Sequence, residues 1–229
     1  MMTPFLFQYN SGEIIAKLRS EEKTLLRNIV FELKSGESMA LIGKTGAGKT
    51  MLALSILGLL PENVYMKDVK IILDGIELFE LASKDRTKFL GNEIVYIPQN
   101  GSEFLNPELN VFSNLKDSMK KAGIKRSEFR ELALEKLALV GFPHPEEVIH
   151  KYPFELSGGE CQRVTIAIAA CSNAKLLIAD EPTNGLDDEN IKIFLDLLKF
   201  AFPDAAKIII THDPKIAKLC DKTLGIIKQ

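Results

Sequence analysis

The eight residues Gly43–Thr50, Gly-Lys-Thr-Gly-Ala-Gly-Lys-Thr, constrain this chain more than any other segment. They match the GxxxxGK[ST] pattern of a phosphate-binding loop, in which glycines allow a tight turn and backbone N–H groups point inward at phosphate oxygens. The run Ser38–Ile42 before the loop predicts a buried strand, and Lys49–Leu60 predicts a helix that Pro61 closes. A strand, a glycine loop and a helix in this order predict an α/β nucleotide-binding core.

Several residues of this loop have distinct chemical tasks. Lys49 is expected to reach the β- and γ-phosphates of a nucleotide, and the Thr50 hydroxyl can bind Mg²⁺. The helix that follows contributes its positive N-terminal end. The predicted cofactor-binding residues of this segment are Gly43, Lys44, Thr45, Gly46, Ala47, Gly48, Lys49, Thr50 and Met51.

The segment Leu176–Glu181 predicts an apolar strand that ends in two adjacent carboxylates. Asp180 could hold Mg²⁺, directly or through water. Glu181 points the other way and could orient or deprotonate a water molecule. Such a pair is weak evidence on its own, but downstream of a phosphate-binding loop it indicates the second half of a nucleotide site.

The segment 156–160, Leu-Ser-Gly-Gly-Glu, permits two interpretations. Ser157 and Glu160 have the S-x-x-E spacing of a capping box, which predicts a well-capped helix and nothing more. Gly158 and Gly159, however, strip the helix start of side chains, so a phosphate could approach its N–H groups. The segment alone does not decide between them.

Elsewhere short β-rich runs alternate with helical segments, which predicts a mostly parallel sheet covered by helices. Asp74-Gly75 predicts the turn of a hairpin between Val69–Leu73 and Ile76–Leu78. The helical stretch 104–155, with Ser127 as an expected N-cap, interrupts the alternation and predicts a lobe inserted into a single domain over 1–229. The other predicted elements are strands Glu93–Ile97, Lys175–Ala179, Lys207–Ile210 and Thr223–Ile227 and helices Gly158–Cys171, Asp188–Ala201 and Pro214–Leu219.

Composition excludes some partners. Lys and Arg number 29 and Asp and Glu 31, so the net charge of −2 argues against binding nucleic acid through bulk charge. Cys161, Cys171 and Cys220 lack metal-ligand spacing and are expected to be idle thiols. No apolar run approaches the roughly 20 residues of a membrane span, so the chain is not expected to cross a membrane by itself.

The order of these motifs resembles that of ABC-transporter ATPases over about Leu25 to Gly225. Besides the segments already described, the resemblance rests on Gln99, on Leu186-Asp187 and on Thr211-His212. It implies the ABC ATPase fold, which is α/β: a P-loop NTPase core with a mostly parallel sheet, an antiparallel β subdomain and the inserted helical lobe.

In this family two ATPase subunits pair head to tail and enclose two ATP molecules. The resemblance implies that Glu181 is the catalytic base and that His212 contacts the γ-phosphate and holds the attacking water. Gln99 would complete the Mg²⁺ shell, with Thr50 and Asp180 as the other metal-binding residues, and would sense the membrane domain.

The resemblance also implies contacts across the dimer. Ser157, Gly158, Gly159 and Glu160 would bind the ATP held by the partner subunit, and Asp187 would reach across the interface. The helical lobe would dock onto a membrane-spanning partner. The implied partners are a second ABC ATPase subunit, two transmembrane permease subunits and, through them, an extracytoplasmic substrate-binding protein, with the chain peripheral on the cytoplasmic face of the cell membrane.

A narrower resemblance is to the peptide and nickel importer branch. It is carried by Pro98-Gln99 followed by Leu105–Pro107, by Tyr152–Ser157 and by Ile178–Thr183. It implies uptake of a peptide, nickel or metal-chelate cargo, although no residue of this chain names the cargo. Two alternatives stay open: a soluble ABC ATPase outside transport, and a catalytically weak ATP-binding partner in a heterodimer.

Three positions depart from the family pattern. Glu160 stands where the family usually has Gln, and Phe154 stands where the branch often has His. Leu18 lies near the position from which an aromatic ring usually stacks on adenine, and Tyr9 or Phe7 could take its place only if the loop is longer. The departure at Leu18 affects the stacking on adenine, and the departure at Glu160 affects the contact between the segment 156–160 and the ATP of the partner subunit.

Overall fold

A computed structural model describes residues 5–19, 21–99, 101–183 and 188–227. The chain divides into two compact units. The first contains residues 1–90, 175–181 and 204–229, and the second contains residues 91–174 and 182–203.

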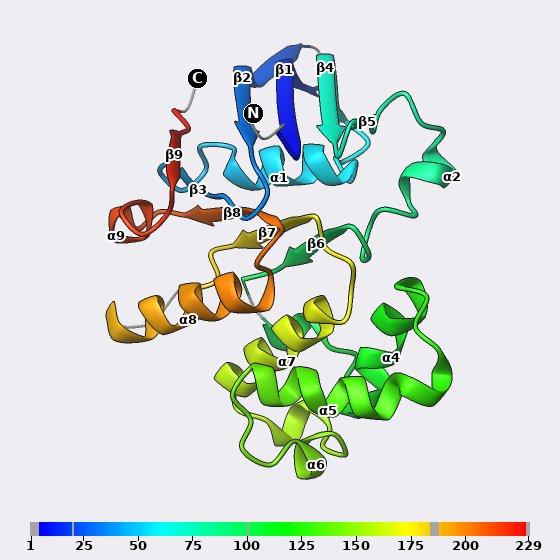
Figure 1. The fold of residues 1–229 in the computed structure, drawn as a ribbon. Helices are drawn as coiled ribbons and strands as arrows, with labels where there is room; N and C mark the ends of the chain where they lie inside the picture. The colour runs from blue at the N-terminus through cyan, green and yellow to red at the C-terminus, as the bar shows by residue number, and fades with distance from the viewer. Residues whose placement is uncertain (1–4, 20, 100, 184–187, 228–229) are drawn as a thin grey trace, which may run out of the picture. The chain divides into compact units, whose positions relative to one another are not determined.

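The first unit contains a parallel sheet in which β7 (Leu176–Asp180), β8 (Ala206–Thr211), β3 (Ser38–Ile42) and β9 (Lys222–Gly225) are neighbours in this order. Every residue of β7 and β8 is buried, as expected for parallel strands covered on both faces. The predicted parallel sheet is confirmed. Helices α1 (Lys49–Leu57), α2 (Ser83–Arg86) and α9 (Pro214–Ala217) belong to this unit, and α1 lies between the parallel sheet and a second sheet (Figure 1).

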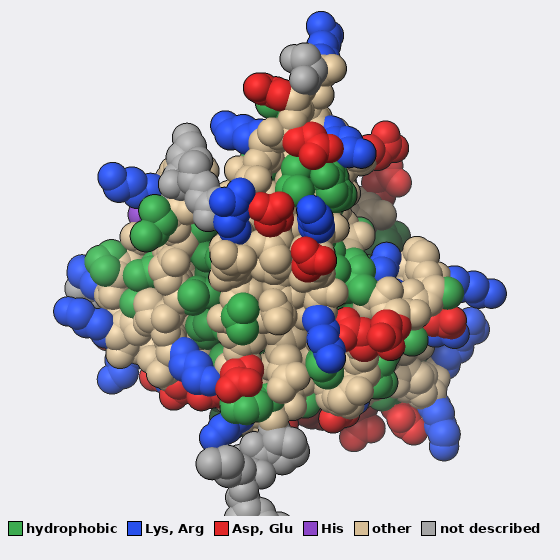
Figure 2. Space-filling view, turned by 90° about the horizontal axis from the view of Figure 1, so that it is seen from above, with side chains coloured by type: hydrophobic (Ala, Val, Ile, Leu, Met, Phe, Trp, Pro, Cys, Tyr) green, Lys and Arg blue, Asp and Glu red, His purple; other side chains and the backbone are tan. Residues whose placement is uncertain are grey.

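The second sheet is antiparallel, with the order β2-β1-β4-β5. Its strands are β1 (Phe7–Lys17), β2 (Glu22–Leu33), β4 (Val64–Leu73) and β5 (Ile76–Glu77), and the expected turn at Asp74-Gly75 joins the last two. Tyr9 Oη lies 2.9 Å from Ser55 Oγ, which ties this sheet to α1. On the face shown in Figure 2, Lys and Arg side chains are interspersed with Asp and Glu side chains.

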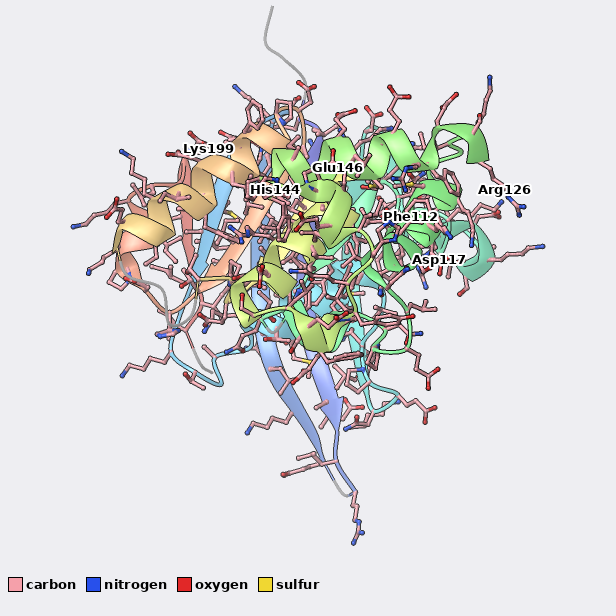
Figure 3. The ribbon with its side chains drawn as sticks, turned by 90° about the horizontal axis from the view of Figure 1, so that it is seen from below. Phe112, Asp117, Arg126, His144, Glu146 and Lys199 are labelled. Atoms are coloured by element: carbon pink, nitrogen blue, oxygen red, sulfur yellow. The ribbon has the colours of Figure 1, made fainter. Side chains whose placement is uncertain are left out.

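The second unit is mainly helical. Its central helix, α7 (Gly158–Ala170), packs against α3 (Gly101–Phe104), α4 (Val111–Lys121) and α5 (Phe129–Leu139). Asn110 caps the start of α4, where its side chain accepts a hydrogen bond from the Ser113 N–H at 2.9 Å. In the same helix, Lys116 Nζ lies 4.3 Å from the ring centre of Phe112, which Figure 3 labels. The remaining elements are β6 (Ile94–Ile97), α6 (Pro145–Val148), α8 (Asp188–Ala201) and the 3₁₀ turns Arg126–Glu128 and Pro153–Glu155.

Several predicted helix ends are wrong. Helix α7 ends at Ala170 and not at Cys171, and α9 ends at Ala217 and not at Leu219. Helix α1 ends at Leu57 and not at Leu60, because Gly58 takes a left-handed conformation (φ 67°) and its N–H bonds back to the last turn. Ser127 does not cap a helix: it lies inside the 3₁₀ turn, and α5 begins only at Phe129. Phe129, Ala133 and Leu137 are nevertheless buried along one face of α5, whereas Leu132 is half-buried.

None of the helices in the described ranges is both long enough and apolar enough to span a bilayer.

Candidate functional site

The loop Gly43–Thr50 leaves β3 and enters α1 in the first unit. Gly43 is required by a close approach, since a Cβ there would lie 2.6 Å from the backbone oxygen of Ile226. Gly48 has φ 102°, and a Cβ would meet Leu26 Cδ2 at 2.9 Å. The loop is therefore built for glycine at both of its ends.

Lys49 places its charge beneath this loop. The side chain is 7% exposed, and its ammonium donates hydrogen bonds to the Gly43 oxygen at 2.8 Å and the Lys44 oxygen at 3.4 Å. The same ammonium lies 3.7 Å from Glu181 Oε1. A cation held at the base of a glycine loop at a helix N-terminus matches what a triphosphate requires.

Two oxygen ligands meet beside the loop. Thr50 is the second residue of α1, and its hydroxyl donates to Asp180 Oδ2 at 3.0 Å. Asp180 ends β7 and is 7% exposed. A hydroxyl and a carboxylate are the hard oxygen donors that Mg²⁺ prefers, so this pair fits the predicted metal ion.

Glu181 follows directly and points to different partners. Its Oε2 lies 2.8 Å from His212 Nδ1, while its Oε1 faces Lys49. Its backbone has φ 45°, a left-handed conformation that costs a non-glycine residue about 1–3 kcal/mol and is concentrated at functional sites. A hydrogen bond of 2.9 Å from its N–H to the Ile210 oxygen of β8 holds this conformation. Asp180 and Glu181, adjacent in the sequence, thus face different partners: Asp180 contacts Thr50, and Glu181 contacts His212 and Lys49.

Met51 follows Thr50 in α1 of the first unit, and the other remaining predicted site residues within the described ranges lie in the second unit. Gln99 is exposed, two residues after β6. Ser157 caps α7, and Gly158 and Gly159 leave open space where a Cβ would stand. The hydrogen bonds of a capping box between Ser157 and Glu160 are present. Asp187 lies outside the described residues.

The model of the ABC transporter family matches residues 26–184, which include the phosphate-binding loop, the segment 156–160 and the acidic strand. The chain belongs to the ABC transporter family.

Individual ABC proteins resemble the chain over most of its length. It is 37% identical to the oligopeptide transport ATP-binding protein OppD of Bacillus subtilis, over 91% of this chain and 59% of that one. It is 32% identical to the metal-staphylopine import system ATP-binding protein CntD of Staphylococcus aureus, over 89% of this chain and 76% of that one. The chain therefore spans about three fifths to three quarters of these two relatives.

A solved ABC structure has the same fold. The dimeric post-hydrolysis state of the ATP-binding cassette MJ0796, bound to ADP and Pi, superposes with a TM-score of 0.81 at 25% identity and covers 96% of this chain and 94% of that one. The predicted ABC ATPase fold is confirmed.

The expected adenine contact needs a correction in this ABC cassette. Phe7 and Tyr9 are 0% and 1% exposed, because their rings face the core side of β1, so neither can present a ring to a base. Leu18, just beyond β1, is 47% exposed and offers only apolar contact.

Sequence reasoning missed two supports of the site. Ile226 lies against Gly43, and its N–H donates to the Ile42 oxygen at 2.7 Å; Leu26 of β2 packs against Gly48. Both residues are ordinary apolar residues far from the loop in sequence, so no local signal marks them.

Proposed function

We propose that this ABC cassette is the ATP-binding and ATP-hydrolysing subunit of an importer. It dimerises around ATP and drives the uptake of peptide or metal-chelate cargo through membrane subunits. The observation that carries this proposal is the cluster of Lys49, Thr50, Asp180, Glu181 and His212 at the carboxyl ends of β7 and β8 and at the start of α1. Two relatives, an oligopeptide transport protein and a metal-staphylopine import protein, support the two cargo classes.

In this proposal the residues of the cluster divide the work. Glu181 accepts a proton from the attacking water at its carboxylate, and His212 fixes the orientation of that carboxylate. Lys49 offers its ammonium to phosphate oxygens in exchange for the loop carbonyls. Thr50 and Asp180 would hold Mg²⁺, which neutralises phosphate charge when bound.

The dimer would use residues of the second unit. Ser157, Gly158, Gly159 and Glu160 would face the ATP of a second ABC ATPase subunit, and Asp187 would lie at the interface. The solved dimeric state of the similar cassette MJ0796, bound to ADP and Pi, supports the pairing of two subunits. The helical lobe over about 104–155 would dock onto transmembrane permease subunits, which places the chain on the cytoplasmic face of the membrane.

The test is phosphate release from the complex that co-purifies with a tag on this chain. Glu181→Gln should lower turnover about 10²- to 10⁴-fold while ATP-dependent subunit association persists. Lys49→Ala should weaken ATP binding itself. Unchanged turnover in either variant, or a tagged chain that never brings membrane subunits with it, would contradict the proposal. Stimulation of turnover by either peptides or metal chelates in reconstituted vesicles would choose between the cargo classes.

A further inference from the structure

The carboxylate of Glu160 accepts a hydrogen bond from the hydroxyl of Ser157. Ser157 Oγ donates to Glu160 Oε2 at 2.7 Å, and the Ser157 N–H donates to the same oxygen at 2.8 Å. In return the Glu160 N–H donates to Ser157 Oγ at 3.3 Å. Because a serine hydroxyl has one proton, Ser157 cannot donate it to a phosphate while this arrangement lasts.

The arrangement favours the ionised carboxylate. The hydrogen bonds from the Ser157 backbone and side chain lower the pKa of Glu160 below its usual value, and the positive charges of Lys151 and Arg163 lower it slightly more. A negative charge therefore lies in the first turn of α7, beside the open space above Gly158 and Gly159. A triphosphate that approaches these glycines meets this charge and an engaged hydroxyl.

We propose that Glu160 is a positioning residue that withholds the Ser157 hydroxyl from ATP, so that this segment binds the ATP of the partner subunit more weakly than it would with a neutral residue at position 160. The inference rests on the proposed function, because it requires the segment 156–160 to face the ATP of a second subunit. To bind the Ser157 hydroxyl, ATP must replace the charge-assisted hydrogen bond between Ser157 and Glu160 with a hydrogen bond to its own phosphate. The phosphate is also repelled by the negative charge of the Glu160 carboxylate. The neutral amide that the family usually has at this position carries no charge and holds the Ser157 hydroxyl by a weaker hydrogen bond, so both costs are smaller.

The test compares Glu160→Gln with the unchanged chain in the purified complex, by turnover as a function of MgATP concentration. Glutamine keeps an oxygen that can accept from the Ser157 N–H, so the helix cap is retained. We expect the ATP concentration at half-maximal turnover to fall about two- to fivefold, as for the loss of one exposed like charge. We expect kcat to change less than this concentration. Glu160→Asp, which keeps the charge, should not lower the concentration.

A matched control exists in the same segment of chain. Glu155 caps the preceding 3₁₀ turn by accepting from the Tyr152 N–H at 2.7 Å, so Glu155→Gln makes the same charge change in a similar cap. It should leave the half-maximal ATP concentration unchanged. Adding Ser157→Ala to Glu160→Gln should abolish the gain, because the released hydroxyl is then missing.

Each outcome decides one of the two proposals. If Glu160→Gln leaves the half-maximal ATP concentration unchanged or raises it, or if Glu155→Gln lowers it equally, the role of Glu160 is wrong, even though the ATPase proposal stands. If Lys49→Ala and Glu181→Gln are as active as the unchanged complex, the proposed function itself fails.

Discussion

His212 Nδ1 lies 2.8 Å from Glu181 Oε2, and this contact joins the carboxyl ends of the neighbouring parallel strands β7 and β8. His212 is the more exposed partner, with 56% of its side chain accessible against 16% for Glu181. The imidazole of His212 therefore lies on the solvent side of the Glu181 carboxylate. The left-handed backbone of Glu181 and this contact together fix the orientation of the carboxylate.

Replacing His212 by alanine should release the Glu181 carboxylate and lower ATP turnover about 10²-fold, the cost typical of a misplaced catalytic group. ATP binding should persist, because Lys49 and the loop are untouched. Phosphate release and equilibrium nucleotide binding measure the two effects separately. His144→Ala is the control: His144 is exposed in the second unit (Figure 3), and its loss should leave turnover unchanged.

Removing the Thr50 hydroxyl should weaken Mg²⁺ binding. In Thr50→Val the shape is kept but the oxygen 3.0 Å from Asp180 Oδ2 is lost, so the Mg²⁺ concentration for half-maximal turnover should rise roughly tenfold or more. A titration of turnover with Mg²⁺ at fixed ATP measures this shift, and chelation with EDTA should abolish activity. Thr50→Ser retains a hydroxyl and should behave almost as the original; an equal rise in both variants would contradict the metal assignment.

Tyr9→Phe should destabilise the first unit. The substitution removes the buried hydrogen bond to Ser55 Oγ, and a bond of this kind contributes about 0.5–1.5 kcal/mol to the free energy of unfolding. Denaturant unfolding followed by circular dichroism gives the value. Tyr65→Phe changes a surface hydroxyl of the same sheet and should alter the free energy by less than about 0.5 kcal/mol. A larger effect at Tyr65 than at Tyr9 would reverse the expected order.

Cys171 should resist alkylation in the folded chain. Burial raises the pKa of its thiol to about 12, so at pH 8 very little of it is the reactive thiolate. Cys220 is only partly buried and should react first with iodoacetamide, as mass spectrometry can establish. Raising the pH from 8 to 10 should increase the small thiolate fraction of Cys171 about 100-fold, yet at pH 10 only about one thiol in a hundred would be ionised, so Cys220 should still react first. All three cysteines should react in denaturant. Modification of Cys171 before Cys220 would refute the burial argument.

Where the sequence predicts the fold correctly, the signal is local. Ser38–Ile42 is a run of mostly apolar residues before a glycine loop, and the strand has those bounds. The hairpin at Asp74-Gly75 is also local, because Asp74 and Gly75 both adopt the positive φ that its turn requires. Likewise, Thr50 and Asp180 can be paired in advance, since both belong to motifs whose order implies a shared site.

The failures come from contacts between distant residues. Whether Tyr9 faces a ligand or the core depends on Ser55, 46 residues away, and no pattern near Tyr9 reveals this. The misplaced start at Ser127 arises because a serine suits a 3₁₀ turn as well as an N-cap. The S-x-x-E spacing predicts the hydrogen bonds between Ser157 and Glu160. It does not predict that the Ser157 hydroxyl donates its one proton to Glu160, which is what matters for a phosphate.

Strand β3, which delivers the phosphate-binding loop, has β8 and β9 as its neighbours, and both are made from the last quarter of the sequence. Asp221 also binds Ser38 at the start of β3, across 183 residues, with hydrogen bonds of 2.8 and 2.6 Å. During synthesis on the ribosome the loop therefore emerges early, but its strand has no neighbour in the parallel sheet until β8 has been translated and lacks its second neighbour until Lys222–Gly225 have followed. The phosphate-binding loop therefore gains its full support only after strands far downstream have been made, and until then an apolar strand must be kept from other chains.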